Sequence, residues 1–362
     1  MKTFIVLLPL LYLACNIYTF CKLWKAMRLP LVGKIAASTL FWCMAFAFIA
    51  AMSMRNSDVP YPIASTLYTI GSMWMLIGMI CAVCCLFFDV THLFFPTLKS
   101  GLWYSAGIAV LIAAGGYINH ITPQIVELNL KVEKPLKEKV RIVAVSDLHL
   151  GHGTGKRMLG KFVEMINAQS PDLILIIGDL VDNSTIPLEE TRMHEELSLL
   201  SAPMGVYMVA GNHEYISNID SCYRFIEKTS IHLLRDSVVS LPCGVELILR
   251  DNVMNKKRLS IDKLCATADA KKPTILLEHE PVELEEKDAL GIDLAMSGHT
   301  HNGQVWPGSL IVNKIYKQAS GYRKWNNSHV WVSSGLSLWG PPVRIGTKGD
   351  IAVITLEGTS EE

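Results

Sequence analysis

The charged residues of this chain are distributed unevenly along its 362 residues. Residues 1–119 contain two acidic side chains, whereas nearly all of the 33 Asp and Glu residues lie beyond residue 120. Half of the chain is hydrophobic and 18% is charged, which is too apolar for an ordinary soluble domain of this length. We therefore divide the chain into an apolar N-terminal part and a polar C-terminal part. The equal numbers of basic and acidic residues argue against a nucleic-acid binder driven by bulk charge.

Four apolar stretches occupy the N-terminal part, at about residues 3–21, 35–52, 64–88 and 101–118. Each approaches the ~20 residues that a helix needs to cross ~30 Å of hydrocarbon. The first follows Lys2 as a signal peptide would, but it lacks a small-residue cleavage site and three more such stretches come after it. Buried helices of a soluble fold are the alternative, and consecutive soluble helices rarely lack a polar stripe. We predict an all-α transmembrane region of about four helices over residues 1–120.

The loops between these stretches indicate an orientation in the membrane. The first loop holds no acid and four bases, Lys22, Lys25, Arg28 and Lys34. Such an excess of bases is typical of cytoplasmic loops. The second loop holds Arg55 and Asp58, and the third is nearly neutral around Lys99. With four crossings, the N-terminus and the C-terminal part lie outside the cytoplasm, in a multi-pass protein of a bacterial inner membrane. Lysines between residues 131 and 139 oppose this interpretation.

Runs rich in β-branched residues appear in the C-terminal part and alternate with helical patterns. Five of them have the composition of buried strands: Val140–Val145, Leu173–Ile177, Val206–Val209, Thr274–Leu277 and Ile292–Met296. Helical apolar spacing lies between them, in Lys156–Gln169 and Leu188–Leu200. This alternation predicts an α/β domain with layered sheets. We place the domain at residues 140–357, after a linker at 121–139 and before a tail at 358–362.

Polar side chains follow each of the five predicted strands. The segments are Ser-Asp-Leu-His at 146–149, Gly-Asp-Leu-Val-Asp at 178–182, Gly-Asn-His-Glu at 211–214, Glu-His-Glu-Pro at 278–281 and Gly-His-Thr-His at 298–301. Open α/β sheets build their sites at the carboxyl ends of strands. Alternation along an extended segment places both side chains of a D-x-H or H-x-H pair on the same side. We expect the five segments to form one site.

The residue types in these segments suit a pair of metal ions. Two divalent ions ~3.5–4 Å apart need a bridging ligand that carries charge, which a carboxylate provides. Imidazole and carboxylate without thiolate suit Mn, Zn, Fe or Co, and exclude a Cys-rich structural zinc site. The sequence therefore predicts two divalent metal ions as cofactors.

The five segments, in this order, resemble the signature of the calcineurin-like metallophosphoesterases: D-x-H, G-D-x-x-D, G-N-H-[DE], H and G-H-x-H. The stretches Gly298–Gln304 and Trp339–Gly346 are similar to those of a membrane-associated bacterial branch. The resemblance covers residues 140–357. Each segment alone is a weak signal, so the specificity of the resemblance comes from the presence of all five in this order. It implies a layered β-sandwich flanked by helices.

The resemblance also implies a role for each matching position. Three residues would hold the first metal: Asp147, His149 and His301. Three others would hold the second: Asn212, His279 and His299. Asp179 would bridge the two metals. His213 would contact the phosphate and protonate or stabilise the leaving oxygen, and the nucleophile would be a water activated by the metals.

Four further residues are candidates for supporting roles. His152 lies in a glycine-rich loop after the first ligands and is a candidate substrate contact, with an ordinary surface or core histidine as the alternative. Arg344 is a candidate phosphate clamp, with an exposed structural arginine as the alternative. Asp182 and Glu214 are candidates for orienting a ligand from behind.

Attachment to a membrane favours a substrate at the bilayer. We predict a hydrolase that cleaves a phosphoester or pyrophosphate bond in a phosphorylated, lipid-linked substrate, and no nucleic-acid partner. The resemblance includes the UDP-2,3-diacylglucosamine pyrophosphohydrolases of lipid A synthesis, whose reaction requires a cytoplasmic site. Two other classes are a non-catalytic membrane sensor or scaffold, against which the complete ligand set argues, and a transporter. The apolar stretches hold no charge at mid-depth, which disfavours the transporter.

Overall fold

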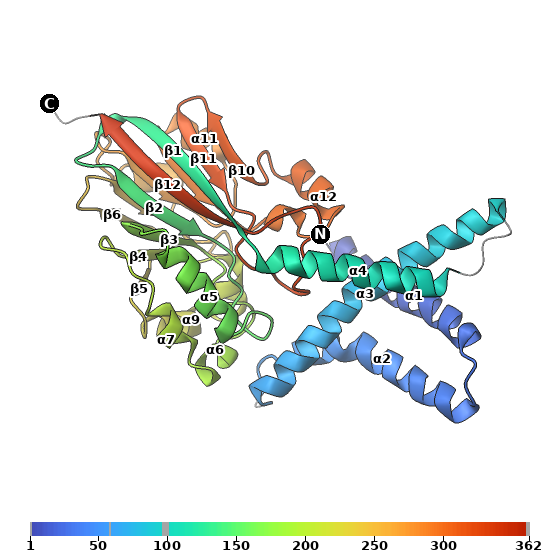
Figure 1. Ribbon diagram of the computed structural model, residues 1–362. Helices are drawn as coiled ribbons and strands as arrows, with labels where there is room; N and C mark the ends of the chain where they lie inside the picture. Colours follow the sequence, from blue (N-terminus) through green and yellow to red (C-terminus); the bar gives the residue numbers. More distant parts are fainter. Residues whose placement is uncertain (1, 58, 96–100, 360–362) are drawn as a thin grey trace. The chain divides into compact units, whose positions relative to one another are not determined.

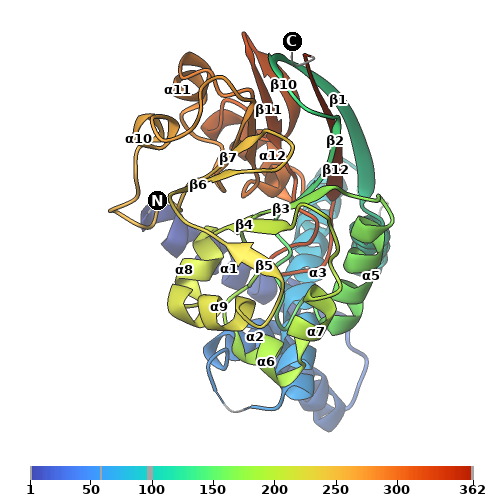
Figure 2. The ribbon, with the colours of Figure 1, turned by 90° about the vertical axis from the view of Figure 1, so that its left-hand side faces the viewer.

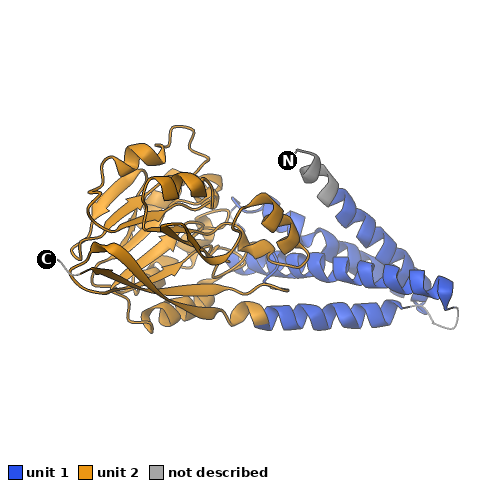
Figure 3. Cartoon of the chain, turned by 90° about the horizontal axis from the view of Figure 1, so that it is seen from above, with its two compact units in different colours: residues 1–118, 340–343 blue, residues 119–339, 344–362 orange. Residues whose placement is uncertain are grey.

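The computed structural model describes residues 2–57, 59–95 and 101–359, so Asp58, Lys99 and the last three residues of the predicted tail lie outside the described residues. The chain forms two compact units (Figure 3). Unit 1 contains residues 1–118 and 340–343, and unit 2 contains residues 119–339 and 344–362. The sequence division near residue 120 thus coincides with a structural boundary.

Four helices form unit 1 and its continuation into unit 2: α1 (Lys2–Ala26), α2 (Leu31–Ser53), α3 (Tyr61–Phe94) and α4 (Leu102–Ile121) (Figure 1). They overlap the four predicted apolar stretches. Over the described residues, α2, α3 and α4 are long and apolar enough to cross a membrane. About four spanning helices were expected from the sequence, and three of the described helices meet the length and composition of a membrane span. The described part of α1 is more polar, since it carries Asn16, Thr19, Lys22 and Lys25.

Small residues allow the helices of unit 1 to approach closely. A Cβ at Gly71 of α3 would lie 2.0 Å from the backbone nitrogen of Phe48 in α2, so only glycine fits at this crossing. Some polar side chains of the bundle are paired across helices. Asn16 accepts a hydrogen bond from Trp74 Nε1 at 3.1 Å.

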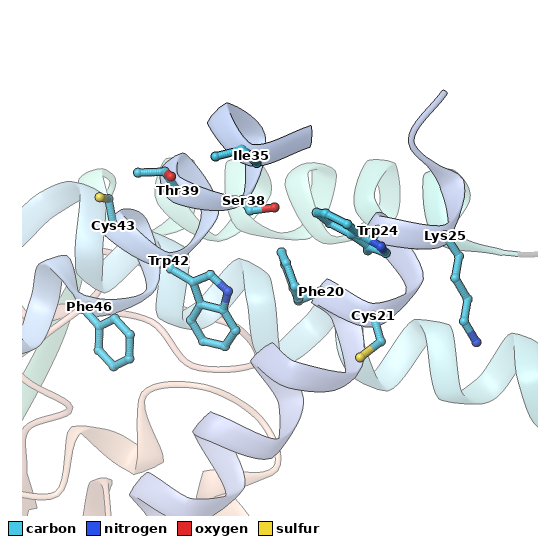
Figure 4. Close-up of a pocket in the computed structure, with 10 residues that line it drawn as sticks. All are labelled: Phe20, Cys21, Trp24, Lys25, Ile35, Ser38, Thr39, Trp42, Cys43 and Phe46. Carbon is cyan, nitrogen blue, oxygen red and sulfur yellow. The ribbon is translucent and has the colours of Figure 1, made fainter. Parts of the chain in front are cut away.

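A groove of about 830 Å³ runs between α1 and α2 (Figure 4). Aromatic rings, aliphatic groups and thiols form most of its wall, including Phe20, Trp24, Trp42 and Phe46. Lys25 is the single charged residue among those that line it. The groove therefore lacks the paired ionisable groups that mark ion and solute pathways through membrane helices.

Unit 2 is built on two six-stranded sheets (Figure 2). The strand order of the first sheet is β1 (Gln124–Pro135), β12 (Asp350–Thr359), β2 (Val140–Val145), β3 (Leu173–Ile177), β4 (Val206–Val209) and β5 (Ile231–Leu233). The order of the second is β10 (Gly321–Trp325), β11 (Ser328–Val332), β9 (Leu294–Ser297), β8 (Thr274–Leu277), β7 (Glu246–Leu249) and β6 (Ser237–Ser240).

One hydrophobic core lies between the two sheets and takes side chains from both, such as Leu175 of β3 and Ile275 of β8. The helices of unit 2 are α5 (Lys156–Asn167), α6 (Ile186–Glu190), α7 (Met193–Leu197), α8 (Asn212–Ile216), α9 (Ile219–Ile226), α10 (Ile261–Cys265), α11 (Leu284–Ala289) and α12 (Gly308–Ile315), with the short 3₁₀ helix η1 (His301–Gly303). Phe162 of α5 and Phe225 of α9 pack on the outer face of the first sheet. Ile261 of α10 and Leu284 of α11 cover the second sheet. The layered α/β sandwich expected from the sequence is confirmed.

Parallel pairing aligns the strands that carry the polar segments. β2 pairs with β3 and β3 with β4, and in the second sheet β8 pairs with β9, all in parallel. Four of the five predicted strands have the predicted bounds, and β9 begins two residues later than Ile292. Because parallel strands end at the same edge of a sheet, the segments that follow them meet there.

Three further regions differ from the sequence-based prediction. Residues 121–139, expected as a linker, contain β1, which pairs in parallel with β12 along the edge of the first sheet. Alternating burial in this strand places Leu130 and Val132 in the core. The helix expected at 188–200 is split into α6 and α7, because Arg192 adopts a left-handed conformation with φ of 55°. The sheet also extends past residue 357, since β12 ends at Thr359.

Candidate active site

The five polar segments converge at the carboxyl ends of their strands. Asp147 and His149 follow β2, and Asp179 follows β3. Asn212 and His213 form the first turn of α8, directly after β4. The remaining three candidate ligands follow the second sheet: His279 after β8, then His299 and His301 after β9. Both sheets therefore contribute to one site, as the sequence predicts.

Three side chains form the first cluster. Asp147 Oδ1 lies 3.3 Å from His301 Nε2 and 3.7 Å from His149 Nε2, and the two imidazole nitrogens are 3.1 Å apart. One ligand atom from each residue lies within 4.8 Å of the others, which is the spacing of a metal site. These are the residues that the resemblance assigns to the first metal.

The second cluster shares its carboxylate with the first. Asp179 Oδ2 lies 3.1 Å from His279 Nε2 and 3.9 Å from His149 Nε2, so one oxygen faces ligands of both clusters. His299 joins Asp179 and His279 within 4.8 Å. His299 Nδ1 is 2.9 Å from Asn212 Oδ1, which places the amide oxygen beside this group. Asp179 therefore occupies the position of a bridging ligand.

The hydrogen bonds around the clusters leave the ligand atoms available. Ser146 Oγ and the His299 backbone N–H donate to Asp147 Oδ2 at 2.5 and 3.1 Å. His279 Nδ1 lies 2.7 Å from the carbonyl oxygen of Ile177, and a carbonyl only accepts, so Nδ1 is the donor. Asp147 Oδ1 and His279 Nε2 are buried and have no hydrogen-bond partner among the described residues. Such orphaned atoms fit metal ligands held in orientation by their outer neighbours.

The backbone of the ligands is strained. Asp147, His149, Asp179, His299 and His301 all have positive φ, between 44° and 71°. Non-glycine residues rarely adopt this conformation, and such strain is concentrated at functional sites. Here the left-handed backbone conformation turns the side chains of these five residues toward the site, at the point where each strand ends.

Two glycines permit the close approach of these segments. A Cβ at Gly211 would lie 2.1 Å from Asp179 Oδ1, and a Cβ at Gly298 would lie 1.9 Å from Ser146 Oγ. Any side chain at either position would displace a candidate ligand or its support. The glycines in the G-N-H and G-H-x-H segments are therefore steric requirements of the site.

His213 lies at the edge of the site and is held by Asp182. Its Nδ1 is 2.5 Å from the carbonyl oxygen of Asp182, so this nitrogen donates and Nε2 remains at the opposite end of the ring. Asp182 Oδ1 also lies 3.4 Å from His213 Nδ1 and 3.5 Å from His149 Nδ1. Asp182 thus stands behind both imidazoles, where the sequence places an orienting carboxylate.

Glu214 joins two of the ligand segments from behind. Its carboxylate is fully buried and accepts from three backbone N–H groups: those of Gly211 at 2.7 Å, Asp179 at 3.0 Å and Val181 at 2.9 Å. These bonds fix the segment after β3 against the start of α8. The placement agrees with the orienting role considered for Glu214, and contact with a substrate is excluded by its burial.

The histidines of the site differ in pKa because their electrostatic surroundings differ. Burial lowers the pKa of His149, but the carboxylates of Asp147, Asp182 and Asp179 outweigh burial and raise this pKa to about 10. For His301 burial prevails over the Asp147 carboxylate and lowers its pKa to about 3. Burial also opposes the charge of His279, yet Asp179 raises the pKa of His279 well above its ordinary value. The carboxylates therefore favour protonated imidazole at His149 and His279, whereas burial favours neutral imidazole at His301.

His152 and Arg344 lie in different surroundings. His152 is half-buried in the loop after β2, where burial lowers its pKa against the charge of Asp182. Substrate contact by His152 stays a prediction. Arg344 is buried, not exposed, and its Nη2 donates to the carbonyl oxygens of Ser334, Gly335 and Ser337 at 2.6–2.9 Å. The loop it holds passes beneath the first cluster, since a Cβ at Gly335 would lie 2.9 Å from that of Asp147.

Charged groups beside the second cluster are buried and paired. Glu278, next to His279, lies 3.1 Å from Arg250, 2.7 Å from Arg258 and 3.0 Å from Lys287. Glu280, on the other side of His279, accepts from Asn252 Nδ2 at 2.9 Å. Neither acid is surface charge.

Asn252 belongs to a sixth strand-end segment that the sequence-based prediction missed. The segment Arg250-Asp251-Asn252 follows β7, and Tyr215 of α8 donates to Asp251 at 2.7 Å. The apolar run Val245–Leu249 before it was the available signal for a strand.

Comparison with known proteins identifies the family. The model of the calcineurin-like phosphoesterases matches residues 140–303. An uncharacterized metallophosphoesterase of Helicobacter pylori (strain J99) is 32% identical to this chain over 275 residues, which are 73% of each chain. The chain belongs to the calcineurin-like metallophosphoesterases and is a metal-dependent phosphoesterase.

Other relatives show how widely the likeness extends. An uncharacterized metallophosphoesterase of Aquifex aeolicus (strain VF5) is 27% identical over 259 residues, which cover 69% of this chain and 98% of that protein. A Bos taurus protein named "Transmembrane protein with metallophosphoesterase domain" is 28% identical over 277 residues, 69% of this chain and 61% of that one. The likeness is therefore not confined to bacteria, in contrast to the bacterial branch that the motifs suggested.

The protonation of the metal-free site predicts how metal affinity depends on pH. A histidine must be neutral to bind a metal, and below about pH 10 His149 carries a proton that has to leave. We expect the apparent affinity for Mn²⁺ or Zn²⁺ to rise as the pH increases from about 6 to about 9. Calorimetric titration in two buffers of different ionisation enthalpy will measure the protons released. A binding heat that is identical in both buffers contradicts the prediction.

Proposed function

We propose that this protein is a membrane-anchored phosphohydrolase that cleaves a phosphoester or pyrophosphate bond in a lipid-linked substrate, on the extracytoplasmic side. The observation that carries the hydrolytic part is the pair of ligand clusters joined at Asp179, with Asp147 Oδ1 and His279 Nε2 buried and left without hydrogen-bond partners among the described residues. Two divalent ions fit this donor set of imidazoles, carboxylates and one amide.

Each ligand has a defined task in this proposal. Asp147, His149 and His301 would hold the first ion, and Asn212, His279 and His299 the second, with Asp179 between them. When bound, the ions supply Lewis acidity toward a phosphate oxygen and lower the pKa of the attacking water. The buried supports, Glu214 and Asp182 above all, keep the ligand atoms in place so that little reorganisation is needed during the reaction.

His213 is suited to protonate the leaving oxygen. Burial opposes its charge, but Asp182 and Asp179 outweigh burial and raise the pKa of His213 above its ordinary value. Since Nδ1 donates to the carbonyl of Asp182, the second proton of the imidazolium is carried by Nε2. The side chain is 13% exposed, so a substrate can reach it. A general acid of this kind contributes a rate factor of about 10²–10⁴.

Two observations support a substrate and a location at the membrane. Three helices are long and apolar enough to span a bilayer, and the last of them, α4, ends at Ile121, directly before β1 begins at Gln124. Four bases gather where α1 meets α2: Lys22 and Lys25 near the end of α1, Arg28 between the helices and Lys34 near the start of α2. They favour the cytoplasm for this end of the two helices. An extracytoplasmic site disfavours UDP-2,3-diacylglucosamine hydrolysis, which needs a cytoplasmic enzyme. A sensor or scaffold without turnover remains the candidate from another class, and the following substitution distinguishes it.

Replacement of Asp179 by asparagine tests the dinuclear site. Asparagine keeps the oxygen that accepts the His213 N–H bond at 2.9 Å but removes the charge that would join the two ions. We expect the full-length protein, supplied with Mn²⁺ or Zn²⁺, to hydrolyse an aryl phosphodiester, and Asp179→Asn to lower the rate about a hundredfold or more.

The matched control for this substitution is Asp220→Asn, at an exposed position in α9. It should retain the wild-type rate. A wild-type protein that binds both metals but does not hydrolyse the diester would favour the sensor. Equal rates for Asp179→Asn and wild type would contradict the bridging role.

The role of His213 predicts a dependence on the leaving group. In His213→Asn, an alkyl phosphodiester with a poor leaving group should lose about 10²-fold or more in kcat, whereas a p-nitrophenyl ester should lose much less, because its leaving oxygen needs no proton. Metal content, measured by elemental analysis, should be unchanged. An equal loss for both esters would assign His213 to metal binding or structure in place of proton donation.

The side of the membrane is testable with reporters on the full chain. Alkaline phosphatase fused after Thr359 should be active and green fluorescent protein at the same point should be dark, because the first folds only outside the cytoplasm and the second only inside. Fusions after Met27, between α1 and α2, should give the opposite pattern. A fluorescent C-terminal fusion would place the site in the cytoplasm and restore UDP-2,3-diacylglucosamine as a candidate substrate.

A further inference from the structure

The helix α12 exposes an apolar surface directly after the metal-binding segment. None of its eight residues is buried. Its side chains Leu310, Ile311 and Ile315 are 57%, 49% and 66% exposed, and Trp306, just before the helix, is 61% exposed. A short helix of a soluble domain ordinarily packs its apolar face on the core. We call Trp306, Leu310, Ile311 and Ile315 the α12 patch.

Other large hydrophobic residues exposed on the described part of unit 2 are scattered. Leu199, for example, is 60% exposed but lies singly after α7. Isolated exposed side chains are normal, whereas four within ten residues form a contiguous feature of the kind that marks an interaction surface.

The chain segment that carries the patch is basic. The twenty residues from Trp306 to Trp325 contain four basic residues and no acid. Lys314 projects from the helix itself and is exposed, and Arg323 lies 4.8 Å above the ring of Trp325. One of the four, Lys317, is paired with Glu285. An apolar helix face flanked by Trp and basic residues has the composition of a helix that lies in the interface of an anionic membrane.

The patch is fixed to the active site at both ends. Its N-terminal end is five residues from the candidate ligand His301, and Tyr316, which caps the helix, has its ring 6.1 Å from that of His299. The helix can therefore not move far without moving two candidate ligands.

The patch is also linked to the end of a membrane-spanning helix within unit 2. The Trp306 N–H donates to the Ile345 carbonyl at 2.8 Å, and Thr347 Oγ1 donates to the Gln304 carbonyl at 2.9 Å. Asn119, in the last turn of α4, donates to the carbonyls of Arg344 and Thr347 at 3.1 and 2.7 Å. One short segment, residues 344–347, thus holds both the end of α4 and the loop that carries Trp306.

We propose that the α12 patch docks on the bilayer, with its apolar side chains among the acyl chains and its basic residues on anionic headgroups. The bilayer is the occupant that fits, because α4 qualifies as a membrane span and its last turn is bonded to the segment that holds the patch. Docking presents the metal site to headgroups of lipids in the same membrane. The inference rests on the membrane anchoring in the proposed function but does not require turnover.

The test uses the full chain in vesicles of phosphatidylcholine and phosphatidylglycerol. A benzophenone amino acid is placed at Leu310, at Ile315 or, as the matched control, at Leu199, which is equally exposed. After irradiation, lipid adducts at 310 and 315 should exceed those at 199 several-fold. Equal yields at all three positions overturn the proposal, and so does a crosslink from 310 to a second copy or to another part of the chain.

Charge reversal gives a second measurement. Lys314→Glu with Lys324→Glu should lower the adduct yield at 310 in anionic vesicles, whereas Lys161→Glu on α5 should not. An unchanged yield in the double variant overturns the electrostatic part. Hydrolysis of the aryl diester is followed in the same samples. Hydrolysis without lipid adducts rejects docking and leaves the function intact, and adducts without hydrolysis support docking while rejecting the hydrolase.

Discussion

Two carboxylates, Asp147 and Asp179, are buried at the ends of neighbouring strands. The rest of the site has to compensate for the removal of their charge from water. An ionised carboxylate without a partner costs several kcal/mol when it is taken out of water. His149, His279 and His301 surround the two groups, and backbone or hydroxyl donors occupy the outer oxygen of Asp147. Burial would raise the pKa of Asp179, but the imidazoles, His279 first, hold it below the ordinary value. In the absence of metal the protonated rings of His149 and His279 stand in for the charge of the ions, whereas His301 is neutral.

The fold meets this constraint by distributing ligands over two sheets. Each strand end contributes one or two ligands, and the left-handed backbone of Asp147, Asp179 and His299 turns the side chains inward. Such strain persists only when the surroundings fix it. Glu214 fixes the first sheet by accepting three backbone N–H groups, and buried Glu278, with its three cations, stands beside His279 in the second. Buried ion pairs of this kind contribute little to stability compared with apolar packing, so their position points to a role in holding the site.

The sequence predicted well that the five strand-end segments converge, because their signals are local. A buried apolar run followed by D-x-H or G-N-H can be read without knowing what lies opposite. Features that depend on pairing across the fold were missed. The alternation Val-Glu-Leu-Asn-Leu-Lys-Val-Glu at 126–133 was a strand signal, but Lys131 and the lysines that follow it were interpreted as a charged linker after a membrane helix. Arg344 was considered as a phosphate clamp or as an exposed structural arginine, and only the structure shows the three carbonyls that hold it inside. The break at Arg192 has no glycine or proline to announce it.

A single covalent tether holds a domain at a membrane but does not fix which face it turns to the lipid. In the proposed arrangement the short connection from α4 to β1 would set the distance of unit 2 from the bilayer. The bonds of Asn119 to residues 344–347 would hold the loop of Trp306 near that connection, but they would not by themselves keep the site at the lipid headgroups. A second attachment would restrict the orientation of unit 2 at little further entropic cost, because the first attachment already keeps the effective concentration of unit 2 at the surface high. Even a weak apolar contact by α12 would then suffice. Because α12 begins seven residues after His301 and its C-cap Tyr316 lies beside His299, the contact proposed to fix the orientation would also lie close to the chemistry.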